Sequence, residues 1–140
     1  MKTHALYLNG HWVTTPTTRP IINPATGDAF TLVCTTDRTA AARALEDAHT
    51  AFLEWRTLTA KARADFLLRL SEEMDRRRDD IAQTITLENG KPITQSLVEV
   101  ALSVDHLRWF AEEARRGYGR IVPNQVDGKR HLVVKTPVGV

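Results

Sequence analysis

The stretch that decides the fold is KPITQSLVEVALSVDHLRWFAEEARRG, residues 91–117. Its apolar side chains recur every three or four positions and share one helical face: Ile93, Leu97, Val100, Ala101, Val104, Leu107, Ala111 and Ala114. Pro92 suits the first turn of a helix, and Gly117 and Gly119 would end it. The pattern predicts one helix over residues 92–116, about 37 Å long at about 1.5 Å per residue. Such a helix needs a surface to cover with its apolar face.

Upstream of this stretch, helical periodicity continues back to residue 36. Thr36 or Asp37 would cap a first helix with its apolar face at Ala41, Leu45, Ala48, Phe52 and Trp55. A second helix is expected after Thr59, with a buried stripe of Phe66, Leu67, Leu70 and Met74. Its continuation over residues 79–88 would bury Ile81, Ile85 and Leu87 and stop at Gly90.

Strand signals lie on both sides of the helices. Residues 6–13, LYLNGHWV, predict a hairpin, because Asn9-Gly10 suits a two-residue type I′ turn. Asn23-Pro24 marks a turn between short strands at 21–22 and 30–33, and Asp127-Gly128 marks another hairpin within residues 120–134. The expected order is therefore strands, three to four long helices, and strands again. The terminal strands cannot easily close into one sheet across the helices, which indicates an incomplete domain.

Composition excludes several classes of function. The 140 residues are 42% hydrophobic and 26% charged, which is enough for one core. A net charge of +2 gives no reason to expect a nucleic-acid or membrane partner. The basic run 76–78 is flanked by acidic pairs, as expected of a solvated helix face. No window approaches the roughly 18 apolar residues of a membrane span.

The residues that could carry chemistry form no catalytic or metal-binding pattern. Cys34 is the single cysteine, which fits a reducing, cytoplasmic setting, and a buried structural role is expected for it. The five histidines have no zinc-site spacing, so no metal is expected. The segment 88–92, ENGKP, lacks the first glycine and the Ser/Thr of a phosphate loop. From the residues alone, no catalytic, cofactor-binding or metal-binding residue is assigned.

Several stretches in order nevertheless resemble a known family. They are LNGHWV, NPATGD, RALEDAHTAFLEWRTLTAKARADFLLRL, LENGKP, RWFAEEARRGYGRIVP and KTPVGV. Together they look like the opening of the NAD(P)-dependent aldehyde dehydrogenase superfamily, over roughly its first third. Within it, LTAKARA and KRHLVVKTPVGV are most similar to bacterial succinate-semialdehyde dehydrogenases.

The resemblance implies an α/β architecture, of which this chain would be a fragment. Residues 1–118 would be N-terminal hairpins and helices that pack on a Rossmann-like cofactor domain. Residues 119–136 would be an oligomerisation-type β-hairpin, and residues 137–140 would begin the nucleotide-binding sheet. A candidate oligomer interface follows at Ile121, Val122, Leu132, Val133 and Val134. The complete enzyme would be a homo-oligomer, either a dimer or a tetramer.

The resemblance also implies a mechanism. A cysteine thiolate would attack the aldehyde, an asparagine and a backbone N–H would hold the oxyanion, and hydride would pass to NAD or NADP. A glutamate would then activate water to hydrolyse the thioester. All these groups would lie beyond Val140, and Cys34 does not match the nucleophile. The isolated chain is therefore expected to be an inactive fragment that binds no cofactor.

Two alternatives stay open from the sequence. The chain could be a non-enzymatic helical module that keeps the assembly surface and binds an intact subunit through residues 119–135. It could also come from an aldehyde dehydrogenase with another substrate, such as an ω-amino or glutarate semialdehyde. The residues that would decide between substrates, or between NAD and NADP, lie outside the sequence.

Overall fold

The computed structural model describes residues 1–139 and contains four helices and several short strands. The helices are α1 (Arg38–Trp55), α2 (Ala60–Arg76), α3 (Arg78–Asn89) and α4 (Ile93–Ala114). The strands are β1 (Lys2–His4), β2 (Leu6–Leu8), β3 (His11–Val13), β4 (Thr18–Ile22), β5 (Ala29–Cys34), β6 (Arg120–Val122) and β7 (His131–Val133). The predicted order of strands, helices and strands is confirmed.

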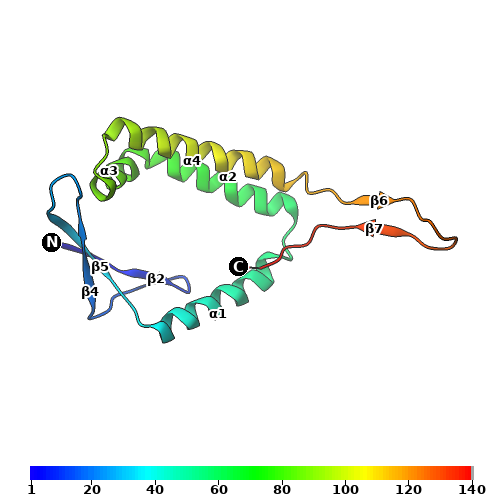
Figure 1. Cartoon of the computed structure of the whole chain (residues 1–140), viewed down its shortest axis with the longest axis horizontal. Coiled ribbons are helices and arrows are strands. Elements are labelled where there is room, and N and C mark those ends of the chain that lie inside the picture. Colours follow the sequence, from blue (N-terminus) through cyan, green and yellow to red (C-terminus); the bar gives the residue numbers. More distant parts are fainter. Residues whose placement is uncertain (140) are drawn as a thin grey trace.

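Helices α2, α3 and α4 form one packed layer, which we call the helical layer (Figure 1). Its core contains Ala82, Val100 and Val104, with Leu97 and Met74 packed against them. Small buried side chains, Ala64 and Ser71 on α2 and Ala111 on α4, allow the two long helices to approach closely. The face predicted for α4 is therefore largely confirmed, except that Ile93 and Ala101 are exposed.

The stripe predicted for α2 is partly wrong. Leu67 and Met74 are half-buried, but Phe66 and Leu70 point outward, with Phe66 47% exposed. The helix packs through the small residues Ala64 and Ser71 together with Met74, so its contact face is turned away from Phe66 and Leu70. Phe66 instead lies beneath the Arg69 guanidinium, 4.4 Å from the ring centroid.

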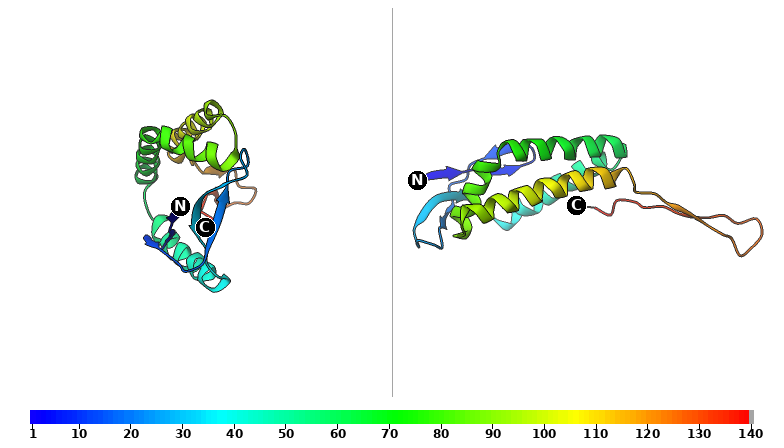
Figure 2. Two further views of the ribbon diagram at one scale, coloured as in Figure 1. Left: turned by 90° about the vertical axis from the view of Figure 1, so that its left-hand side faces the viewer. Right: turned by 90° about the horizontal axis from the view of Figure 1, so that it is seen from above.

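Helix α1 begins as predicted, and its apolar face stays largely uncovered. The Asp37 side chain caps it by accepting a hydrogen bond from the Ala40 N–H at 2.8 Å. No α1 residue is buried, and Leu45 is 68% exposed. The helix runs apart from the helical layer in two views (Figures 1 and 2). It meets α2 at Trp55, whose ring centroid lies 5.2 Å from that of Phe66.

The N-terminal strands form two small sheets. In the first, β5 pairs with β1 in parallel and with β4 antiparallel. In the second, β2 and β3 form a hairpin in which Asn9 and Gly10 both have positive φ, which confirms the expected type I′ turn. The β1–β5 pairing was not predicted, because local sequence patterns carry no signal for a partner about 30 residues away.

Strands β6 and β7 form a two-stranded antiparallel ribbon that projects away from the helices (Figures 1 and 2). Its strands are joined by residues 123–130, with a turn at Asp127-Gly128 closed by the Lys129 N–H to the Val126 carbonyl. Residues 134–139 carry no strand, and Val140 lies outside the described residues. The predicted start of a nucleotide-binding sheet at 137–140 stays a prediction, as does the division into three segments.

Candidate functional site

The ribbon carries the predicted interface residues, and most of them are exposed. Ile121 lies directly across from Leu132, and these side chains are 80% and 66% exposed. Because side chains alternate along a strand, Val122 and Val133 occupy the opposite face. An isolated two-stranded ribbon is marginally stable in water, and exposed apolar patches mark interaction surfaces. The chemistry of this surface suits binding to another polypeptide.

The ribbon starts where the backbone at Gly119 closely approaches that of Val133. A side chain at Gly119 would overlap the backbone carbonyl of Val133. At Gly117, two residues earlier, the nearest atom to an added methyl group would be the Ala114 carbonyl oxygen at 3.9 Å. The ribbon therefore depends on a glycine at 119 but not at 117.

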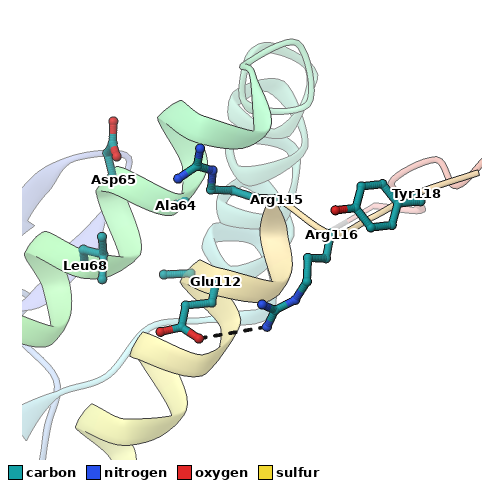
Figure 3. A pocket seen from close by; sticks show the side chains of 8 residues that line it. Ala64, Asp65, Leu68, Glu112, Arg115, Arg116 and Tyr118 are labelled. Carbon is teal, nitrogen blue, oxygen red and sulfur yellow. Dashed lines mark ion pairs between the residues drawn. The ribbon is translucent and has the colours of Figure 1, made fainter.

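A polar groove of about 400 Å³ lies at the root of the ribbon, between α2 and the end of α4 (Figure 3). It is lined by Ala64, Asp65 and Leu68 from α2 and by Ala111, Glu112, Arg115, Arg116 and Tyr118 from α4 and the segment after it. Arg115 points toward α2, whereas Arg116 turns back along α4 toward Glu112 (Figure 3). The groove is thus lined by side chains of both charges and by the apolar side chains of Ala64, Leu68 and Ala111.

Ion pairs engage three of the charged side chains that line this groove, Asp65, Glu112 and Arg116. The Arg116 guanidinium lies 2.7 Å from the Glu113 carboxylate and 4.0 Å from that of Glu112. The hydrogen bond to Glu113 is the main reason that the pKa of Arg116 is raised. Asp65 likewise pairs with Lys61 at 2.6 Å. The groove holds no paired nucleophile and base, so its arrangement offers no catalytic chemistry of its own.

Cys34 is buried, as predicted. Its side chain is 4% exposed, and its sulfur accepts a hydrogen bond from the Thr15 N–H at 3.4 Å. The Cys34 thiol also lies 3.8 Å from the Thr15 carbonyl oxygen. No general base accompanies these contacts, so the geometry agrees with a small buried residue rather than a nucleophile.

The histidines are scattered over the surface, and all five side chains are exposed. Among residues 1–139, no three His, Cys, Asp or Glu side chains come together in a way that could hold a metal ion. None of the described helices has the length and apolarity that a bilayer crossing requires.

The helix starts in the described residues do not fit a nicotinamide dinucleotide. A pyrophosphate site of that kind uses free N–H groups at a glycine-rich turn that opens a helix. Asp37 and Thr59 already cap the first turns of α1 and α2. Asp79 and Asp80 place negative charge in the first turn of α3, and α4 follows Pro92, which has no N–H. No cofactor site is therefore assigned within residues 1–139.

Comparison with known proteins identifies the class. Residues 12–140 match the family described as the aldehyde dehydrogenase family. The chain belongs to this family. It is 40% identical over 136 residues to a glutarate-semialdehyde dehydrogenase of Pseudomonas putida, a match that spans 96% of this chain and 28% of that protein. The resemblance seen in the sequence is thereby confirmed.

Solved structures show the same fold. A succinate-semialdehyde dehydrogenase from Burkholderia pseudomallei superposes with a TM-score of 0.91 at 36% identity, over 97% of this chain and 29% of that one. A betaine aldehyde dehydrogenase mutant from Staphylococcus aureus, solved in complex with NAD+, superposes with a TM-score of 0.89 at 25% identity, over 96% and 28%. The aldehyde dehydrogenase family members matched here are therefore about three and a half times longer than this chain.

The polar groove was not predicted from the sequence. A signal for it exists, because Glu112, Glu113 and Arg116 have the i,i+3 and i,i+4 spacing of helical ion pairs. The approach of Asp65 and Leu68 from α2 has no such local signal, since it depends on how α2 and α4 pack.

Proposed function

We propose that this chain forms the N-terminal part of an NAD(P)-dependent aldehyde dehydrogenase that oxidises a small carboxylate-bearing aldehyde, succinate or glutarate semialdehyde, to the acid. The observation that carries this proposal is the match along nearly the whole chain to semialdehyde dehydrogenases, of which it spans 28%. Two supporting relatives are named for substrates that differ by one methylene group. The nicotinamide cofactor is proposed from the family and from the NAD+ complex of a structural neighbour.

In this proposal the chain contributes scaffold rather than chemistry. The helical layer would support the parts of the enzyme that bind cofactor and substrate. The absence of a fitting phosphate site and of an activated nucleophile within residues 1–139 supports that division. The 140-residue chain by itself is expected to be inactive.

A chimera tests the proposal. Residues 1–140 would replace the matching segment of the P. putida glutarate-semialdehyde dehydrogenase, and reduction of NAD+ and NADP+ would be followed with both semialdehydes. Activity in the chimera, with none from the 140-residue chain, is expected. Aldehyde-dependent reduction by the chain alone would overturn the scaffold role. A chimera that assembles normally but has no activity with either semialdehyde would overturn the family role.

We also propose that the ribbon pairs with a second subunit, so that the complete enzyme is a homo-oligomer. The exposed Ile121 and Leu132 support this. In the chimera, Leu132→Asp should shift sedimentation toward the monomer. Val126→Asp, at an exposed position in the connecting loop, serves as the control. Unchanged sedimentation of Leu132→Asp would remove the ribbon from the interface.

A further inference from the structure

The sheet formed by β1, β5 and β4 meets the helical layer at a close backbone contact. A methyl group built on Gly90 would lie 2.9 Å from the Pro24 Cγ atom and 3.0 Å from the Ala25 nitrogen. Gly90 follows α3, whereas Pro24 and Ala25 belong to the turn between β4 and β5. We call this approach the corner contact. A side chain at residue 90 has no room while the contact is closed.

The corner contact joins two parts of the molecule, the sheet and the helical layer, that are otherwise connected along the chain by α1. Along the chain, the sheet is connected to the helical layer through α1, which has no buried residue. Figure 1 shows the sheet at one end of the molecule, α1 along one side and the helical layer along the other. The turn between β4 and β5 lies beside α3, at the end of the molecule opposite the junction of α1 with α2. The contact therefore restrains a part of the molecule that α1 does not hold by packing.

The turn at the corner keeps its shape by its own hydrogen bonds. The Asn23 N–H donates to the Asp28 carbonyl at 2.8 Å, and the Gly27 N–H donates to the Asn23 carbonyl at 2.8 Å. The nitrogen of Ala25 lies beside Gly90, and its N–H donates to the Asn23 side-chain oxygen at 3.0 Å. Separation from the helices would leave none of these donors unpaired.

The helical side of the corner is equally self-contained. The Gly90 N–H donates to the Thr86 carbonyl at 2.8 Å, with a φ of +74° that ends α3. The Thr86 and Ser96 hydroxyls are hydrogen-bonded at 2.8 Å, and Lys91 forms an ion pair with Glu99. These bonds tie α3 to α4 without help from the sheet.

We propose that the corner contact is a latch that holds the sheet closed on the helical layer and can open reversibly. Two rigid pieces meet there by van der Waals contact, so opening exposes no unsatisfied polar group. The latch needs glycine at residue 90, because any Cβ would hold the two pieces apart. Residues 35–59 would carry the resulting movement, in which the sheet shifts relative to the helical layer.

Spin labels test the latch in the 140-residue chain. Arg19→Cys on β4 and Glu72→Cys on α2 are exposed positions for the labels, and brief labelling spares the native Cys34, which is buried and reacts only when its part of the sheet opens. Pulsed electron paramagnetic resonance would give the distance distribution between the two labels. A single narrow distribution is expected without further change. A broad distribution at this stage would overturn the latch.

Gly90→Ala is the test variant, and Gly128→Ala is its matched control. The two glycines have φ values of +74° and +77°, so alanine causes similar backbone strain at both, but nothing lies within 4 Å of an added methyl group at Gly128. A second, displaced distance population is expected for Gly90→Ala alone. Identical distributions in the two variants would overturn the latch.

Pro24→Ala decides the question if Gly90→Ala fails to fold. It removes the Cγ atom of the contact without placing a side chain at positive φ. Partial loss of the latch should broaden the distance distribution while the helical circular dichroism signal stays unchanged. A distribution as narrow as in the parent chain would show that the contact does not hold the sheet.

Discussion

The helical layer and the ribbon contain the same kinds of apolar side chain, but the helical layer buries them and the ribbon exposes them. Val100 in α4 is 1% exposed, whereas Val134 beside β7 is 70% exposed. In the helical layer, apolar groups from three helices cover one another. In the ribbon, two strands cannot cover both of their own faces. The difference separates residues that stabilise this chain from residues available to bind another one.

The largest expected effect comes from placing a charge in each region. Val100→Asp would bury a carboxylate with no partner, which costs about 3–5 kcal/mol and should abolish cooperative unfolding of the helical layer. Val134→Asp puts the same group in water and should leave stability nearly unchanged. Urea unfolding followed by circular dichroism compares them. Similar losses in both variants would contradict the assigned difference in burial.

A smaller effect is expected from the buried hydroxyl pair of Thr86 and Ser96. Ser96→Ala would leave the Thr86 hydroxyl without its partner and should lower the free energy of unfolding by about 1–3 kcal/mol. Thr86→Val combined with Ser96→Ala should cost less than the sum of the two single changes. Thr84→Val, at an exposed position on α3, is the control. Strict additivity in the double-mutant cycle would exclude a direct bond.

Gly119→Ala should affect the ribbon and spare the helical layer. The added methyl group would push β6 away from the Val133 carbonyl, so amide exchange in both ribbon strands should accelerate. The free energy of unfolding of the helices should change by less than about 0.5 kcal/mol. Gly117→Ala is the matched control, because its added methyl group would make only an ordinary contact, 3.9 Å from the Ala114 carbonyl oxygen. Equal amide exchange rates in the two variants would contradict the close approach of Gly119 to the Val133 carbonyl.

The smallest expected effect is the pH dependence of a surface ion pair. Arg76 donates a hydrogen bond to Glu73 at 2.9 Å, and this bond is the main cause that lowers the pKa of Glu73 below 4.5. Since the folded-state pKa is the lower one, the pair's stabilisation is present above the unfolded pKa and is lost as pH falls through the folded one.

Comparison with Glu73→Gln isolates that contribution. The difference in free energy of unfolding between the parent chain and Glu73→Gln should be small at neutral pH, because both partners of the pair are solvent-exposed. It should shrink toward zero in acid and in high salt. A difference that grows as the pH falls would reverse the assigned direction of the pKa shift.

Local signals predicted local structure well. Asp37 and Thr59 cap helices, and Asn9-Gly10 forms the hairpin turn that its chemistry favours. Side-chain burial was harder to predict. Helix α2 has two candidate faces, and packing on α4 selected the one with Ala64 and Ser71 over the one with Phe66. Periodicity cannot make that choice, because it ranks faces by hydrophobicity and not by fit.

The candidate site divides in the same way. The predicted interface residues Ile121 and Leu132 lie opposite one another on an exposed ribbon, because the connecting loop fixes the register of the two strands. The polar groove was missed, since Asp65 and Arg115 are brought together by tertiary packing across fifty residues. Family membership could be predicted from the sequence because the family's motifs occur along the chain in a fixed order. This signal does not depend on any single contact.

Because Cys34 is buried, its reaction with a thiol reagent can report opening of the surrounding sheet without any added label. Its sulfur lies against the backbone of Thr15 at the end of β5, so a thiol reagent can reach it when that part of the sheet opens. The rate of modification would then measure the sheet's opening in the unaltered chain, separately from helix melting seen by circular dichroism. The Cys34 sulfur thus reports on the sheet formed by β1, β5 and β4, which contributes no helical circular dichroism signal.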